Sequence, residues 1–255
     1  MKKISEAISD LHKMDMEAKK PGWLQGIHPL PKLLVTVFFI LTTVSYGKYD
    51  LDGLLKMGIY LIISFVLGDI SVRILLRRMK AVLALVCLVG IANPFFDRNV
   101  LFLIGDFAVT GGMVSAVTLM LKGVFAVAAS YLLMVTTAVE DLGYALRRLH
   151  VPKVFVTVLM LVYRYIIVLL KEIERMTDAY ALRAPGQKGL HYKVWGTMVG
   201  QLLLRSMDRA QIVYDSMMLR GYCGEFYLRC KKKAGVDDFL YAALWMIALL
   251  ALKYG

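Results

Sequence analysis

From Lys32 to Thr136 the chain consists of long apolar runs separated by shorter connections. A helix needs about 20 predominantly apolar residues to cross a bilayer. The runs of this kind are about Lys32 to Tyr46, Leu51 to Gly68, Ala81 to Phe96 and Gly112 to Thr136. The pattern therefore predicts four membrane-spanning helices in this part of the chain.

The pattern changes after Glu140, where apolar sequence continues without a break into charged sequence. An apolar run, Val154 to Leu170, leads directly into a stretch whose apolar residues recur at helical spacing with charged residues between them. This periodicity predicts one long helix from Lys153 to about Arg183, roughly 45 Å in length at 1.5 Å per residue. The following Ala184-Pro185-Gly186 ends it, because proline disfavours helical geometry in the residue before it.

A second long helix is predicted from Tyr192 to about Arg220. Its apolar or small residues step by three or four positions along one face, which is the spacing of a helical stripe: Trp195, Val199, Leu202, Ser206, Ala210, Val213 and Met217. Gly196 and Gly200 form a small-xxx-small pair that would permit a close helix crossing, although two incidental glycines explain the pair equally well. A last apolar run, Asp238 to about Leu252, predicts a final span.

The charge distribution gives these elements an orientation. The 255 residues are 59% hydrophobic with a net charge of +12, and the mean hydropathy is +0.63. Basic residues concentrate before residue 33, in 73–80 and in 140–233, and such residues favour the cytoplasmic side of a membrane. We therefore predict an all-α polytopic membrane protein with five spans, its N-terminus inside and its C-terminus outside.

The run from Val154 to Leu170 is the hardest to place. If it crossed the membrane, residues 171–233 would lie outside with twelve basic against six acidic side chains, against the usual distribution. We therefore predict that this helix lies under or shallowly in the membrane. The expected domains are a four-span membrane region over 1–139, a cytoplasmic helical region over 140–234 and a C-terminal span over 235–255.

Composition and motifs argue against several classes of function. The basic charge fits a membrane protein, so nucleic acid is not an expected partner. Three cysteines and four histidines are scattered without the spacing of a metal site, and neither a G-x-x-x-x-G-K-[ST] loop nor an H-E-x-x-H pattern occurs. The N-terminus shows no removable signal peptide. Two charged residues in apolar runs, Lys122 and Arg164, are better explained by packing or by the membrane interface than by an ion path.

Both long helices are predicted to end on arginine. Arg183 follows Ala181-Leu182, and Arg220 stands between Leu219 and Gly221. A cation at a helix C-terminus is favourable beside the unpaired carbonyls and the negative end of the helix dipole, which is a sufficient structural explanation. The functional alternative is that each helix end projects a guanidinium into a groove of a soluble partner.

A family resemblance favours the functional alternative. The chain resembles the T component of energy-coupling factor (ECF) transporters, and within that family the cobalt-type CbiQ. The stretches that carry the resemblance are His28-Pro29-Leu30-Pro31-Lys32-Leu33-Leu34, Arg147-Arg148-Leu149-His150-Val151-Pro152-Lys153, Tyr163-Arg164-Tyr165, Glu174-Arg175-Met176, Ala181-Leu182-Arg183 and Ser216-Met217-Met218-Leu219-Arg220-Gly221-Tyr222. Together they cover nearly the whole chain.

The resemblance implies a non-catalytic subunit of a prokaryotic plasma-membrane importer. Such a subunit joins two ABC-type ATPases to a substrate-capturing membrane subunit, here of the cobalt type, and binds no cofactor itself, since ATP is used by the partners. The resemblance makes the two long helices coupling helices. It places ATPase docking at Ala181 and Arg183 and at Leu219, Arg220 and Gly221. The family's short Ala-Arg-X pattern is altered at both places, because Leu182 separates Ala181 from Arg183 and Leu219 precedes Arg220.

The apolar face of the second helix would transmit the motion toward the membrane and the capture subunit. The residues of this face are Trp195, Val199, Leu202, Val213 and Met217. Cobalt rests on the subfamily resemblance, and nickel or a vitamin are alternative solutes. The rivals from other classes are a self-contained secondary transporter, which would show repeats or broken polar spans, and an integral membrane enzyme, which would show clustered carboxylates or histidines.

Overall fold

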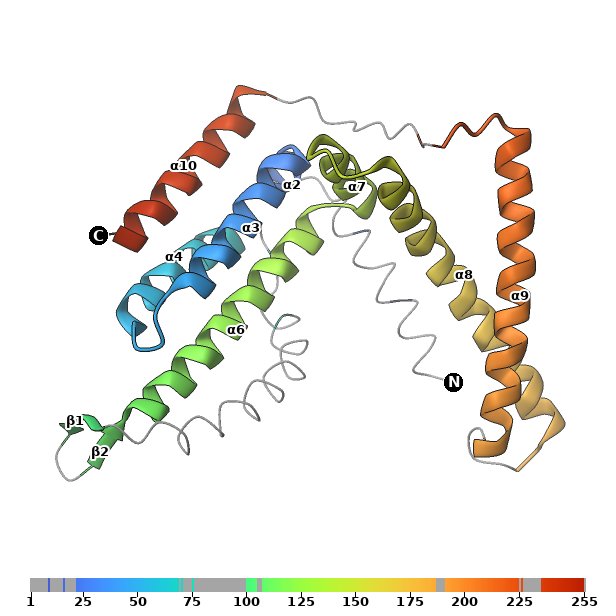
Figure 1. The fold of residues 1–255 in the computed structure, drawn as a ribbon, viewed down its shortest axis with the longest axis horizontal. Helices are drawn as coiled ribbons and strands as arrows, with labels where there is room; N and C mark the ends of the chain where they lie inside the picture. Colours follow the sequence, from blue (N-terminus) through green and yellow to red (C-terminus); the bar gives the residue numbers. More distant parts are fainter. Residues whose placement is uncertain are drawn as a thin grey trace. The chain divides into compact units, whose positions relative to one another are not determined.

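The computed structural model of the 255-residue chain describes residues 22–68, 100–104, 107–186, 191–224 and 235–254, with isolated residues between these ranges. The predicted span from Ala81 to Phe96 and the basic connection at 73–80 lie outside them. The described residues form two compact units (Figure 1). One contains Val139–Cys230, and the other contains Glu17–Ala138 together with Lys231–Gly255.

The second of these units is a helical bundle. It contains the short α2 (Trp23–Gly26), followed by α3 (Pro29–Ser45), α4 (Leu51–Leu67), α6 (Gly111–Thr136) and α10 (Val236–Tyr254). Helix α3 packs against α6 and α10, and α4 packs against the same two helices (Figure 1). These helices confirm the apolar segments predicted at the same positions as helices, within three residues at each end.

A short hairpin precedes α6 in this otherwise helical unit. Strands β1 (Val100–Ile104) and β2 (Phe107–Thr110) pair antiparallel, with Ile104 opposite Phe107, and β2 leads directly into α6 (Figure 1). Both strands are rich in aromatic and branched residues, and the Gly-Asp dipeptide between them is typical of a two-residue hairpin loop. The hairpin lies between the third and fourth predicted spans.

Aromatic side chains fill the centre of the bundle. Phe39 of α3, Tyr60 of α4 and Trp245 of α10 are buried, and Tyr60 stands 4.7 Å from each of the other two ring centroids. The Tyr60–Trp245 pair is edge-to-face, a favourable arrangement of the ring quadrupoles. This cluster ties three helices that are far apart in the sequence into one core.

Two lysines cap helix ends across the α3–α6 pair. Lys32 at the start of α3 donates to the carbonyl of Thr136 at the end of α6 at 3.0 Å, and its side chain is buried. Lys122 within α6 donates to the carbonyls of Val44 and Tyr46 at the end of α3, at 3.2 and 2.6 Å. Helix C-termini leave carbonyls without intrahelical donors, so each lysine satisfies such groups on the other helix. The two helices are therefore antiparallel, and the apolar segment accommodates Lys122 as a cap.

The first turn of α10 is fixed next to the start of α3. The Asp238 carboxylate accepts hydrogen bonds from the His28 amide and the Gly235 amide, both at 2.8 Å. At the other end, the Tyr46 hydroxyl donates to the carbonyl of Leu252 at 3.1 Å. Helices α3 and α10 therefore run in the same direction.

The unit containing Val139–Cys230 consists of α7 (Val139–Arg148), α8 (Lys153–Arg183) and α9 (Tyr192–Leu219). The two long helices confirm the predicted ones, and each boundary agrees within one residue. Helix α7 ends in a turn where His150 adopts a positive φ of 62°. Among the described residues, α6 and α8 are the helices long and apolar enough to cross a membrane, and α3 is a shorter apolar helix. The length and composition of α8 thus permit a crossing that the charge distribution argued against.

Candidate functional site

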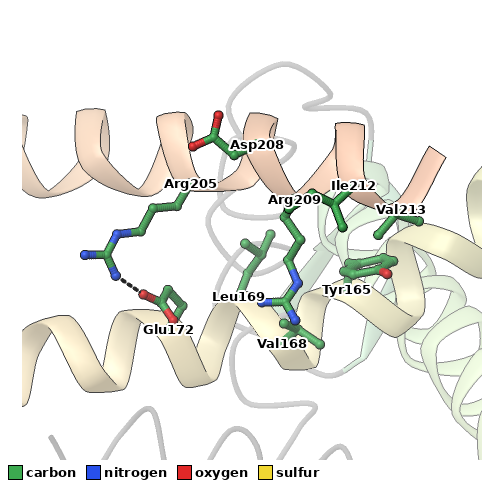
Figure 2. A pocket seen from close by; sticks show the side chains of 9 residues that line it. All are labelled: Tyr165, Val168, Leu169, Glu172, Arg205, Asp208, Arg209, Ile212 and Val213. Carbon is green, nitrogen blue, oxygen red and sulfur yellow. Dashed lines mark hydrogen bonds and ion pairs between the residues drawn. The ribbon is translucent and has the colours of Figure 1, made fainter. Parts of the chain in front are cut away.

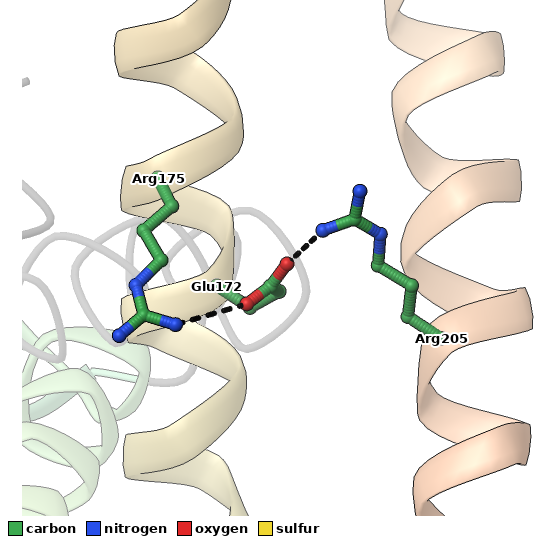
Figure 3. A network of polar contacts seen from close by, with 3 residues as sticks. All are labelled: Glu172, Arg175 and Arg205. Atoms are coloured by element: carbon green, nitrogen blue, oxygen red, sulfur yellow. Dashed lines mark hydrogen bonds and ion pairs between the residues drawn. The ribbon is translucent and has the colours of Figure 1, made fainter.

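Helices α8 and α9 cross at a polar contact. Arg205 of α9 donates to the carboxylate of Glu172 on α8, and Arg175, one turn further along α8, lies 3.7 Å from the other carboxylate oxygen (Figure 3). The Glu172 side chain is only 17% exposed, whereas both arginines are largely in solvent. The carboxylate is therefore held at the crossing between two guanidinium groups, and an ion pair involving a partly desolvated group is stronger than one fully in water.

A pocket of about 490 Å³ lies beside this contact (Figure 2). Its lining consists of Tyr165, Val168, Leu169 and Glu172 from α8 and Arg205, Asp208, Arg209, Ile212 and Val213 from α9. Figure 2 shows Arg209 extending toward α8, whereas Asp208 lies on the side of α9 away from α8. Residue numbers rise along α8 as they fall along α9, so the two helices are antiparallel where they meet.

An apolar groove extends from the crossing toward the start of α8 and the end of α9. It has a volume of about 400 Å³, and most of its surface is hydrocarbon. Its lining includes Val154, Val158 and Leu161 from α8 and Val213 and Met217 from α9. The apolar run predicted at the start of α8 therefore faces an open groove and not a packed core.

The end of α9 has a specific stop. The amide of Tyr222 donates to the carbonyl of Met217, and the amide of Gly221 donates to that of Met218, at 3.0 Å each. Gly221 has a φ of +78°. This pair of bonds with a left-handed glycine is the Schellman arrangement, in which the residue before the glycine is the last of the helix. The Arg-Gly sequence thus fixes Arg220 as the C-terminal cap of α9, followed by an abrupt change of chain direction.

The end of α8 is different. The amide of Ala184 still bonds to the carbonyl of Tyr180, Pro185 follows, and Gly186 has a φ of +93°. Ala181 and Arg183 are exposed, and the Leu182 side chain is 84% exposed. At the end of α9, Leu219 is 90% exposed and Arg220 is exposed as well. Both predicted docking ends therefore present an arginine beside a solvent-exposed leucine.

The structure divides the predicted face of α9 into two parts. Val213 and Met217 line the apolar groove against α8, and Leu202 is half-buried. Trp195 and Val199 are 54% and 56% exposed. A Cβ added at Gly196 or Gly200 would meet nothing within 4 Å, so no close helix crossing uses this pair among the described residues.

Sequence reasoning missed Glu172 and Arg205 as a pair. An ion pair between two helices leaves no periodic signal within either helix, so the apolar stripes do not predict it. Among the described residues, no group of three or more histidine, cysteine or acidic side chains could hold a metal ion. What the two helices can offer is cationic ends and apolar surface, which suit protein contacts.

Comparison with known proteins places these helices in a transport family. The family model of CbiQ, described as cobalt transport protein, matches residues 21–228. The chain belongs to the CbiQ family of cobalt transport proteins. The match includes α8, α9 and the Arg220-Gly221 end, so the features described above lie in the part of the chain that defines a CbiQ protein.

Relatives of this CbiQ-family chain include proteins named for metal transport. An uncharacterized protein of Methanocaldococcus jannaschii is 26% identical over 91% of this chain and 82% of its own length. Nickel permease LarQ of Lactiplantibacillus plantarum is 27% identical over 41% of this chain and 38% of its own. The putative fused cobalt transport protein CbiMQ of Methanocorpusculum labreanum is 28% identical over 37% of this chain and 16% of its own. Membership of the CbiQ family and the long apolar helices α6 and α8 together indicate a transport component in a membrane.

Proposed function

We propose that this chain is the transmembrane coupling subunit of an ECF-type ABC importer in a prokaryotic plasma membrane. It links two cytoplasmic ATPase subunits, which use the ATP, to a membrane subunit that captures the solute. The observation that carries the proposal is the α8–α9 pair, two helices of 31 and 28 residues, of which the first ends on exposed Arg183 and the second is capped by exposed Arg220. Rigid helices of this length transmit a displacement at one end to the other, because packed helices shift as units.

The geometry of the pair supports two separate docking points. Arg220 lies near Arg164, since both line one pocket, and Arg183 stands nineteen residues further along α8, or roughly 28 Å at 1.5 Å per residue. Two cations held that far apart suit two grooves on a pair of ATPase subunits. No nucleotide-binding loop occurs in the sequence, which supports the assignment of ATP hydrolysis to partner chains.

The bundle supports the proposed topology of five spans with the N-terminus inside. Helices α3 and α10 run in the same direction and α6 runs in the opposite one, as crossings from the inside out, the inside out and the outside in would require. In this proposal α8 lies along the membrane surface. Its exposed apolar side chains suit the interface between lipid and water.

The proposed solute is a divalent transition-metal ion, cobalt or nickel. The relatives named above are a nickel permease and a cobalt transport protein, and the second is a fusion of which the aligned part is a small share. This supports a chain that acts as one part of a larger system. A capture subunit that differs between systems would choose the ion, so the choice between cobalt and nickel would not lie in this chain.

The proposal is tested by reversing the charge of the two helix ends. Tagged Arg183→Glu and Arg220→Glu variants would be purified from native membranes, and the associated ATPase subunits and the uptake of radioactive cobalt would be measured. We expect each variant to insert normally but to lose ATPase association and uptake, with the double variant inactive. Lys171→Glu, an exposed change of the same sign away from a helix end, is the control. Retention of ATPase subunits and uptake by the double variant would show that the arginines do not dock the ATPases.

A further inference from the structure

Arg164 lines the same pocket as Arg220. It is the only charged residue between Val154 and Leu170. The pocket has a volume of about 470 Å³ and is formed by the apolar half of α8 and the C-terminal end of α9. Its lining residues include Leu161, Arg164, Tyr165, Ser216, Arg220 and Tyr222. It adjoins the apolar groove, because Leu161, Tyr165 and Tyr222 line both.

The pocket has an unbalanced charge. Its described lining contains two guanidinium groups and no carboxylate, and no ion pair of Arg164 or Arg220 is found within the described ranges. Two like charges beside an apolar surface repel each other, and the repulsion grows as water is excluded. An anion that enters between them removes this cost and gains charge-assisted hydrogen bonds from both guanidiniums. The hydroxyls of Tyr165 and Tyr222 supply further donors.

We propose that this two-arginine pocket receives a carboxylate side chain of the ATPase partner that docks on α9. Arg164 is then a second receptor beside Arg220, and its place in an apolar run is explained by a binding site. This inference rests on the proposed function, and it adds a residue and a chemistry to one of the two docking points. It also makes the two points unequal, because Arg183 ends α8 between exposed Leu182 and Ala184 without a second cation among its flanking residues.

A protein carboxylate fits the surroundings better than a lipid phosphate. Helix α9 has no buried residue, and its last three turns carry Asp208 and Asp215 on exposed positions. Exposed apolar and basic side chains stand among these acids, and a protein surface can match charges of both signs at fixed places, whereas a layer of headgroups cannot. The chain also turns away from the axis of α9 at Gly221, so a docking partner can reach Arg220 and the pocket together.

The test measures binding of the purified ATPase subunits to the full chain in nanodiscs made only of zwitterionic lipid. We expect Arg164→Gln to weaken this binding on the order of ten- to hundredfold, the effect of losing a charge-assisted hydrogen bond. Arg164→Lys should recover part of the loss, because lysine keeps the charge but not the planar fork. The salt dependence of binding should become shallower in Arg164→Gln. Lys171→Gln, which removes a solvent-exposed cation elsewhere on α8, should bind like the unmodified chain.

Three results would overturn the inference. Unchanged ATPase binding by Arg164→Gln would show that Arg164 is not a receptor. A loss that appears only when anionic lipid is present would assign the pocket to a lipid headgroup. Glu225 adjoins Phe226 in the sequence and lies outside the described residues. If Glu225→Gln abolished the effect of Arg164→Gln, the carboxylate would belong to this chain.

The same assay separates this inference from the proposed function. Weak binding by Arg183→Glu together with normal binding by Arg164→Gln would leave the coupling role intact and exclude only the two-arginine pocket. Normal binding by Arg183→Glu and Arg220→Glu would instead exclude docking through the helix-end arginines, on which the proposed function rests. Thermal unfolding of Arg164→Gln serves as the folding control, and we expect no loss of stability, because the change removes a charge from an apolar run.

Discussion

The two units of this protein differ in whether their large apolar side chains are buried. In the bundle, rings such as Phe39 and Tyr60 are buried, and Lys32 and Lys122 donate hydrogen bonds to backbone carbonyls at the ends of neighbouring helices. In the α8–α9 pair, α9 buries none of its residues, although it carries large apolar side chains along its length.

Exposed apolar surface has different meanings in the two units. The outer faces of the bundle expose residues such as Leu41, Ile62 and Val66 without charges beside them, as a lipid-facing surface requires. On α9, exposed Leu203, Leu204 and Met207 alternate with Arg205, Asp208 and Arg209. Lipid would not solvate such a mixture, whereas a protein surface can match it. The contrast supports the proposal that the surface of α9 is completed by another chain.

The largest effect should come from opening the core of the bundle. Phe39→Ala removes a fully buried ring that packs on Tyr60, and we expect a loss of about 3–5 kcal/mol, the usual cost of such a cavity. The matched change on α9, Trp195→Ala, removes a half-exposed ring and should leave stability almost unchanged. Thermal unfolding of the two variants in detergent measures both. Equal destabilisation would mean that α9 contributes to a core of its own.

The second effect concerns the lysine caps. Lys32→Met keeps the length of the side chain but leaves the buried carbonyl of Thr136 without this donor, at a cost of about 1–3 kcal/mol. Lys253→Met removes a lysine whose contact with the Ser45 hydroxyl is exposed, and it should cost less than about 0.5 kcal/mol. Chemical denaturation in mild detergent would rank the two. A smaller loss for Lys32→Met than for Lys253→Met would contradict the capping role.

The lysines also show what the sequence could and could not predict. Helix positions followed from apolar periodicity, and the ends of α8 and α9 followed from Pro185 and Gly221, because these signals are local. The partners of Lys122 could not be predicted, since Val44 and Tyr46 lie on a helix about 76 residues away in the chain. For the same reason, the sequence could not predict the Glu172–Arg205 pair or the pocket that Arg164 and Arg220 both line. The hairpin before α6 was a local signal that we overlooked.

A smaller effect is expected at the crossing of α8 and α9. Glu172→Arg and Arg205→Glu should each cost about 1 kcal/mol or less, because at least one partner of the bridge is in solvent. Each single change should nevertheless broaden the distance between spin labels at exposed Ala179 and Thr197, since α9 has no buried residue to hold its angle. The double variant, with the charges exchanged, should restore a narrow distribution. Broadening that the exchange does not repair would mean that the bridge does not set the crossing.

The smallest effect separates the glycines of the two units. Gly200→Ala adds a methyl group that meets nothing within 4 Å, so α9 should gain about 0.5–1 kcal/mol of helix stability. Gly58→Ala in α4 would place its Cβ 3.2 Å from the Phe125 ring, so the same gain should be reduced or lost. Unfolding measurements show whether each substitution raises or lowers stability. Binding of the capture subunit shows whether the surface around Gly200 contacts the partner. If Gly200→Ala stabilises the isolated chain but weakens the complex, the space beside Gly200 is occupied by the partner, as an incomplete surface on α9 requires. If it leaves the complex unchanged, the exposed face of α9 around this glycine is not part of the contact, and the partner surface must lie nearer the apolar groove at Val213 and Met217.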